Sequence, residues 1–384
     1  MESKGRMATH LSTLQNLYPA PFVKLMPMRH AGFKPETRNP KLETRNQKPE
    51  TYTQGEPKMK RIAQHRLRHF VLSFALIVLS MGFLGGGSGW AFDLPALNLG
   101  FTSFLDGGPP AGPGFYLSEY LQYYHSDRFN DVHGKRLLPD FADEELNVWV
   151  SLTQFIYQSN QDILLGGKWG LDVIVPVVGL EFEHDLPGPP RDNGAGFGDL
   201  LIGPFLQWDP IMGPNGPLFM HRIELQLIFP TGKYDSDREL NPGSNFFSFN
   251  PYWAATVFMT QRWTASWRIH YLWNATNDDP NRLFAGADDS QAGQAFHLNF
   301  ATDYEVIPKT LRLGINGYYL KQITDTQADD HDLPDSREQV FAVGPGALWH
   351  ITKNSHLFFN AYFETAAENR PEGNRFVLRF VQHF

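Results

Sequence analysis

The chain has 384 residues, of which 42% are hydrophobic and 14% aromatic, with a formal net charge of −8 and no cysteine. Its mean hydropathy of −0.35 excludes a bundle of transmembrane helices, because each helical span needs roughly 20 consecutive apolar residues. The lack of cysteine excludes a disulfide framework and thiolate metal sites.

Residues 1–91 differ from the rest in charge and in pattern. They hold 14 Lys/Arg and 5 Asp/Glu, so the remainder of the chain carries −17. Residues 1–58 lack a periodic apolar pattern, which indicates a disordered extension or a gene start placed too early. Residues 59–91 have the basic, apolar and small-residue layout of a secretory signal peptide, with cleavage between Ala91 and Phe92. An N-terminal anchor helix is the alternative.

The acidic remainder, from residue 92 onward, argues against nucleic acid as a partner, because phosphate binding requires clustered cationic charge. Residues 92–114 are rich in Gly and Pro and are expected to form a flexible N-terminal segment. A short segment folded into the mouth of a barrel is the alternative for the same residues.

Residues 115–384 contain twelve strand-like runs. Connections after odd-numbered runs are long and polar, whereas those after even-numbered runs are short. This alternation, with an even number of runs, predicts an all-β, transmembrane antiparallel β-barrel of about 12 strands with long extracellular loops and short periplasmic turns. The runs are at 115–125, 145–158, 168–182, 197–208, 217–230, 246–260, 262–274, 293–305, 310–323, 338–351, 355–365 and 375–384.

Side chains that alternate along a strand point to opposite faces, so each run has a lipid face and a lumen face. In the run at 262–274, Trp267 and Ile269 share one face, and Arg268 and His270 share the other. An Arg or Lys facing lipid at the midplane costs about 2–4 kcal/mol, which places the charged face inside. The predicted lumen-lining residues are Arg222, Glu224, Gln226, Arg268, His270, Arg312, Asn316, Tyr318, Asn360, Tyr362, Glu364, Arg375 and Arg379.

These inward charges are compatible with two arrangements. A charged ladder would set an electric field in an open pore and orient anionic or polar-headed solutes. A set of salt-bridged side chains would instead hold a narrow barrel shut. Twelve strands lie between eight-stranded barrels, which side chains fill, and open sixteen-stranded porins, so the strand number does not decide.

The C-terminal run ends on an aromatic residue and resembles the closing-strand signal with which bacteria insert outer-membrane barrels. Its apolar face predicts a membrane-insertion signal of Phe376, Leu378, Phe380 and Phe384. The expected partners are therefore the barrel-assembly machinery, outer-membrane lipids and lipopolysaccharide of a Gram-negative bacterium, together with small-molecule solutes.

Catalytic and metal sites have little support in the sequence, and no cofactor is expected. Ser266, His270 and Glu364 are the residue types of a hydrolase triad, but nothing in the sequence brings them within hydrogen-bond reach. Asp329, Asp330, His331, Asp332 and Asp335 could chelate calcium. We favour a solvated acidic loop for this cluster.

Several short segments carry a resemblance to a known family. They are Gly114-Phe-Tyr-Leu, Gly196-Phe-Gly-Asp-Leu, Pro230-Thr-Gly-Lys-Tyr, Asn274-Ala-Thr-Asn, Gly344-Pro-Gly, and Glu364 followed by Asn369-Arg-Pro-Glu-Gly. From about Gly108 to Phe384 the chain resembles the outer-membrane family of the meta pathway of phenol degradation. The resemblance implies an outer-membrane channel, sometimes associated with uptake of aromatic or other hydrophobic compounds. It brings no established catalytic or ligand residues.

The function expected from these observations is passive passage of small, hydrophobic or aromatic solutes through the barrel, without enzymatic activity. An outer-membrane hydrolase is one alternative. A closed structural or adhesin-like barrel is the other, and it would bind a partner through its acidic loops while conducting no solute.

Overall fold

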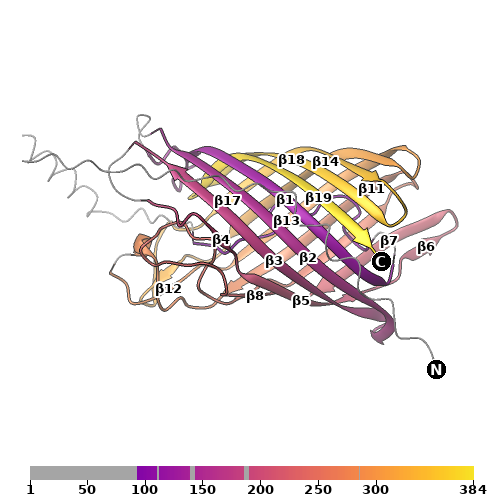
Figure 1. Ribbon diagram of the computed structural model, residues 1–384, viewed down its shortest axis with the longest axis horizontal. Helices are drawn as coiled ribbons and strands as arrows, with labels where there is room; N and C mark the ends of the chain where they lie inside the picture. Colours follow the sequence, from indigo (N-terminus) through magenta and orange to yellow (C-terminus); the bar gives the residue numbers. More distant parts are fainter. Residues whose placement is uncertain (1–92, 110–111, 139–142, 186–189, 285) are drawn as a thin grey trace, which may run out of the picture. The chain divides into compact units, whose positions relative to one another are not determined.

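A computed structural model describes residues 93–109, 112–138, 143–185, 190–284 and 286–384. These described residues form a closed antiparallel β-barrel of twelve strands (Figure 1). The expected extension at 1–58, the signal peptide at 59–91 and the cleavage point lie outside the described residues. Within the described part of the chain, no helix is long and apolar enough to cross a membrane.

Nine of the twelve barrel strands are continuous and three are interrupted. The continuous strands are β1 (Gly114–Phe129), β2 (Glu145–Leu164), β3 (Gly167–Glu183), β11 (Trp263–Asn274), β13 (Ala295–Ile307), β14 (Leu311–Gln322), β17 (Gln339–His350), β18 (Ser355–Glu368) and β19 (Pro371–His383). The interrupted strands are β4 (Ala195–Phe197) with β5 (Leu200–Gln207), β7 (Gly216–Glu224) with β8 (Leu227–Phe229), and β9 (Ser248–Phe249) with β10 (Tyr252–Phe258).

The barrel closes between its first and last strands. β1 pairs with β2 on one side and with β19 on the other, so that Tyr120 lies opposite both Leu152 and Arg379. A short strand, β6 (Ile211–Gly213), extends β7 at the periplasmic end. The extracellular loops add β12 (Ser290–Gln291), β15 (Gln327–Ala328), β16 (His331–Asp332) and the 3₁₀ turn η2 (Arg282–Phe284). The expected all-β barrel is confirmed.

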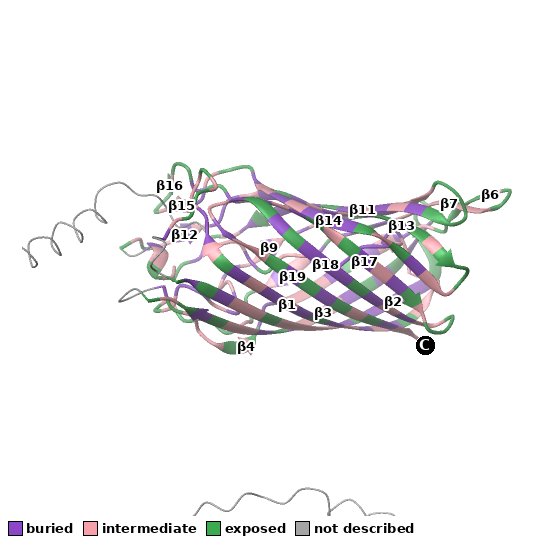
Figure 2. Ribbon diagram, turned by 90° about the horizontal axis from the view of Figure 1, so that it is seen from above, coloured by how far each residue is buried: buried purple, intermediate pink, exposed green. Residues whose placement is uncertain are grey.

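Alternating exposure along the strands agrees with the predicted faces. On β1, Tyr116 is 1% exposed and Phe115 is 44% exposed. Figure 2 shows the same alternation as bands of buried and exposed residues along β1, β18 and β19. Apolar side chains therefore cover the lipid face, which is the environment that a transmembrane barrel requires.

One of the three interrupted strands is broken where loop contacts replace the ladder. The run expected at 197–208 is broken at Gly198 and Asp199. The carboxylate of Asp199 accepts hydrogen bonds from the backbone N–H groups of Gly232 and Ser244, at 2.9 and 2.8 Å. Asp199 therefore fixes an extracellular loop, which alternation along the strand does not reveal.

One connection is shorter than expected. The link after the eleventh strand was expected to be long, but β18 and β19 are joined by Asn369 and Arg370 alone. Asn369 has a φ of 53°, in the left-handed region that a tight turn uses and that Asn tolerates better than most residues. Glu372 also accepts the backbone N–H of Ala367 at 3.1 Å, which holds the two strands together at the turn.

Candidate functional site

Residues 93–109 lie inside the barrel and run along its lumen. At the extracellular end, the Thr326 hydroxyl donates to a carboxylate oxygen of Asp93 at 3.4 Å. Towards the periplasmic end, the backbone N–H of Gly107 donates to the Thr256 hydroxyl at 2.9 Å. The structure thus places these residues in the lumen, which agrees better with the alternative of a segment folded into the barrel mouth than with the flexible terminus expected at 92–114. Hereafter residues 93–109 are called the lumenal segment.

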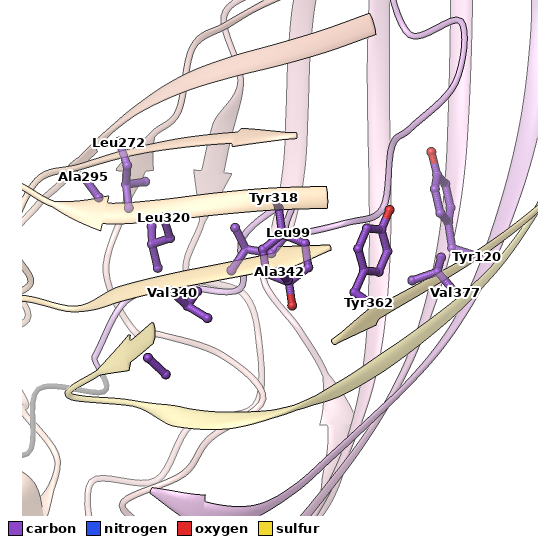
Figure 3. Close-up of a cluster of buried hydrophobic side chains, with 11 residues drawn as sticks. Leu99, Tyr120, Leu272, Ala295, Tyr318, Leu320, Val340, Ala342, Tyr362 and Val377 are labelled. Atoms are coloured by element: carbon purple, nitrogen blue, oxygen red, sulfur yellow. The ribbon is translucent and has the colours of Figure 1, made fainter. Parts of the chain in front are cut away.

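The part of the lumenal segment around Leu99 and Gly100 is anchored by side chains from three strands. Arg375 on β19 donates to the Leu99 carbonyl at 2.7 Å, and Tyr362 on β18 donates to the Gly100 carbonyl at 2.8 Å. Asn299 on β13 accepts the Gly100 N–H at 2.8 Å. Figure 3 shows Leu99 among the buried side chains that line the barrel at this level. Each polar backbone group held in this way is satisfied away from water, which buried segments require.

The part of the lumenal segment nearer the periplasmic end is anchored by an ion pair. Asp106 accepts two hydrogen bonds from the guanidinium of Arg268 on β11, at 2.7 and 2.8 Å. Both side chains are buried, with 4% and 10% of their surfaces exposed. Gly107 follows, and a Cβ there would lie 2.4 Å from backbone atoms of Met220 and Thr256. Only glycine therefore permits the segment to lie this close to the wall.

Two cavities border the lumenal segment. The larger, of about 270 Å³, lies towards the extracellular side and is lined by residues 93–99 and by strand and loop side chains. The smaller, of about 50 Å³, lies below and is lined by Phe104, Leu105 and Asp106. Arg268 lines both. The larger space is called the lumenal cavity from here on.

The wall of the lumenal cavity is mainly apolar. Its apolar side chains come from the lumenal segment, from β2 and β3, and from the extracellular loops. They include Leu94, Leu97, Leu99, Phe101, Leu146, Val148, Leu152, Ile174, Val178, Leu180, Leu240, Phe246 and Phe284. Such a wall favours uncharged solutes with apolar surface, because burial of that surface is the main source of affinity.

The thirteen residues predicted to line the lumen all lie on the inner face of the barrel. Twelve are buried, and Arg379 is partly exposed. Most are paired: Arg312 with Asp303, Arg222 with Gln207 at 3.0 Å, and Glu224 with the Tyr252 hydroxyl at 2.5 Å. The others are engaged as follows: Gln226 with Asn250, His270 stacked on His297, Asn316 with the Ala361 carbonyl, Tyr318 with Glu364, Tyr362 and Arg375 with the lumenal segment, Arg379 over Tyr120 and Phe358, and Asn360 at 0% exposure.

The three candidate hydrolase residues are not brought together. The Ser266 hydroxyl pairs with that of Thr256 at 3.0 Å. His270 lies four residues further along β11, roughly 13 Å away at the rise of a strand. Glu364 accepts hydrogen bonds from Tyr124 and Tyr318. No proton relay from Ser266 is formed.

The acidic loop at 329–335 has local contacts. Asp329 accepts the backbone N–H of Asp288 at 2.7 Å, and Asp332 accepts the Gln327 amide at 2.8 Å. Over the described ranges, no group of three or more His, Cys, Asp and Glu side chains is arranged to hold a metal ion.

The side chains of the predicted insertion signal lie on the outer face of β19 or at its end. Phe376, Leu378 and Phe380 are 37–40% exposed, and Phe384 is 69% exposed. The lumenal segment itself was missed as a site, although it carries a signal. Leu94, Leu97, Leu99, Phe101 and Phe104 recur between its Gly, Pro and Asn residues. This apolar pattern indicates a segment whose side chains are packed against other parts of the chain.

Comparison with known proteins identifies the family. The family model described as "Putative MetA-pathway of phenol degradation" matches residues 126–380, more than half of the chain. The chain belongs to this family. A search of curated proteins returned no match.

A solved structure shows the same fold. The crystal structure of the COG4313 outer membrane channel from Pseudomonas putida F1 matches with a TM-score of 0.61 and 19% identity, covering 75% of this chain and 100% of that one. The KdgM porin matches with a TM-score of 0.34 and 10% identity, covering 70% of this chain and 99% of that one. The TodX deltaS2S3 mutant monoaromatic hydrocarbon channel matches with a TM-score of 0.38 and 9% identity, covering 71% of this chain and 91% of that one. The match to the COG4313 channel, at 19% identity, concerns the fold alone.

Proposed function

We propose that this family member is an outer-membrane channel for passive passage of small hydrophobic or aromatic solutes. The observation that carries the proposal is the lumenal cavity, an apolar chamber of about 270 Å³ on the axis of a transmembrane barrel. Membership of a family named for phenol degradation supports it, as does the likeness to a structure named as an outer membrane channel.

In this proposal solutes enter the lumenal cavity from the extracellular side, and the lumenal segment is the barrier that they must pass. The thirteen inward residues then serve to hold that segment and to line the path, and none has a catalytic role. In this proposal displacement of the segment opens the path, because its residues lie in the lumen and line both cavities.

We also propose the targeting route. The chain would be exported and cut between Ala91 and Phe92, after which the barrel-assembly machinery would recognise β19 through Phe376, Leu378, Phe380 and Phe384. N-terminal sequencing of protein purified from outer membranes tests the cut. A mature terminus upstream of residue 59 would contradict it.

The experiment that tests channel function compares the wild type with a variant lacking residues 93–109. Solute flux is measured in proteoliposomes and conductance in planar bilayers. We expect small solutes to pass through the wild type and a severalfold larger conductance in the deletion variant. Serine replacements at the exposed Ile211 and Met212 provide a control outside the lumen. No permeation by either folded protein would overturn the proposal and leave a closed structural barrel.

A further inference from the structure

The smaller of the two cavities, called the lower cavity from here on, has an excess of positive charge in its wall. Three arginines line it, Arg222, Arg268 and Arg379, but within the described part of the chain only one acidic side chain does, Asp106. Asp106 already pairs with Arg268, from which it accepts hydrogen bonds of 2.7 and 2.8 Å. The other two arginines therefore meet no carboxylate in the wall of the cavity.

Arg222 and Arg379 present free N–H groups. The Nε atom of Arg222 donates to Gln207 at 3.0 Å, and over the described ranges its two Nη atoms make no hydrogen bond. Arg379 makes neither a hydrogen bond nor an ion pair with any described residue. Of the two guanidinium groups, only the Nε atom of Arg379 is fully buried without a partner, so the four Nη atoms keep accessible surface. An acceptor that enters the lower cavity can reach them, because both side chains line it.

Aromatic rings hold both guanidinium groups in place. The central carbon of the Arg222 group lies 3.9 Å from the centroid of the Phe205 ring. That of the Arg379 group lies 5.0 Å from the centroids of both the Tyr120 and the Phe358 ring. A guanidinium group stacked on a ring keeps its N–H edge available, and that edge matches the geometry of an oxygen anion. The two groups are therefore positioned without being neutralised.

Two further carboxylates of the barrel wall do not occupy these N–H groups. Asp172 and Glu224 are buried, at 2% and 0% exposure, and neither lines the lower cavity. Asp172 accepts the Gln154 amide at 2.6 Å instead. His350 and His356 do line the cavity, and a proton gained by either would add to its positive charge. The groups that face the lower cavity therefore favour an anion.

We propose that the lower cavity binds one small monovalent anion, a halide or a short carboxylate, with Arg222 and Arg379 as its donors. The volume of about 50 Å³ suits such an ion, since a site for one water needs about 10–15 Å³. Arginines taken out of water without a counter-charge are costly, and a bound anion lowers that cost. This inference goes beyond the passage of apolar solutes, and it does not require that the barrel conducts.

The test measures the NMR linewidth of chloride, which broadens when the ion exchanges with a site on a large particle. The purified barrel is held in an uncharged detergent, and formate, bromide or benzoate is added as competitor. We expect the barrel to broaden the chloride signal. Formate and bromide should remove the excess linewidth, whereas benzoate at the same concentration should leave it, because its ring is too large for the cavity.

Variants assign the site to the two arginines. In Arg222→Gln and in Arg379→Gln the affinity for chloride should fall about tenfold or more, which is the loss expected for a hydrogen bond to a charged group. Arg262→Gln is the matched control. Arg262 is exposed, lies outside the lower cavity and also has no ion pair among the described residues, and its replacement should leave the linewidth unchanged.

Several results would overturn the inference. One is the absence of excess linewidth with the wild type. Another is displacement of chloride by benzoate as readily as by formate, which would place the site outside the lower cavity. A loss in Arg262→Gln equal to that in Arg379→Gln would show that exposed arginines bind the ion. Whichever of formate and bromide competes at the lower concentration identifies the class of anion, and either result supports the site. If the two arginine variants do not fold, the competition in the wild type decides alone. Solute flux tests the channel proposal separately.

Discussion

Replacement of Asp106 by Ala should release the lumenal segment. The change leaves the guanidinium of Arg268 buried inside the barrel without the carboxylate that pairs with it. The Tyr252 ring, whose centroid lies 4.1 Å from the guanidinium carbon, remains beside it. Breaking one side of a buried ion pair costs about 3–5 kcal/mol. A change of about 1.4 kcal/mol alters an equilibrium constant tenfold, so the population of molecules with the segment displaced should rise on the order of a hundredfold or more.

The chain has no cysteine, so a single Cys introduced in place of Phe104 reports this displacement directly. Phe104 is 2% exposed, and a water-soluble maleimide reaches position 104 only when the segment leaves the wall. We expect the labelling rate to rise by the same factor, with longer open times in planar bilayers. An unchanged rate would refute the reasoning.

Two controls separate loss of the ion pair from general damage. Asp106→Asn combined with Arg268→Gln removes both charges, and labelling should stay near the starting rate, because uncharged replacements of both partners of a buried pair are close to neutral. Asp237→Asn breaks the exposed pair with Arg282, whose side chains are 74% and 49% exposed. Such pairs contribute about 0–1 kcal/mol, so labelling should not change measurably.

Three further predictions concern pH, backbone space and assembly. Burial raises the pKa of Asp93 to about 6 and that of Glu338 to about 8. Both pKa values exceed those of free carboxyl groups, so the docked segment should be most stable in acid and should lose stability as the pH rises through the two pKa values. Conductance should therefore increase between pH 5 and 9. Glu338→Gln should flatten this increase. Gly100→Val should raise conductance at every pH, since φ is +82° and a Cβ would lie 2.7 Å from the Tyr362 ring. Phe384→Ser should lower the amount of barrel in outer membranes, measured by heat-modifiable mobility on gels, without changing the conductance of refolded protein.

Most of the barrel could be predicted from sequence because alternation is a local property. Arg268 and His270 are two residues apart and must share a face, so placing one places the other. The same reasoning extends to every continuous strand. It fails where a side chain takes hydrogen bonds from a distant loop, as Asp199 does with Gly232 and Ser244, because that contact leaves no periodic trace.

The lumenal segment was predicted only as the alternative to a flexible terminus, for a related reason. Its conformation is set by partners more than 150 residues away, such as Arg268 for Asp106 and Asn299 for Gly100. Its own composition of Gly, Pro and Asn indicates an irregular chain, which is also what a free terminus looks like. Distinguishing the two required the geometry of the wall that receives it.

The course of the lumenal segment constrains how the barrel is assembled. The segment leads directly into β1, and the seam between β1 and β19 completes the cylinder. The strands therefore have to enclose residues 93–109, which belong to the same chain and lie inside the closed cylinder. Because Asp93 lies at the extracellular end and β1 starts from the periplasmic side, the chain runs along the lumen before its first strand begins.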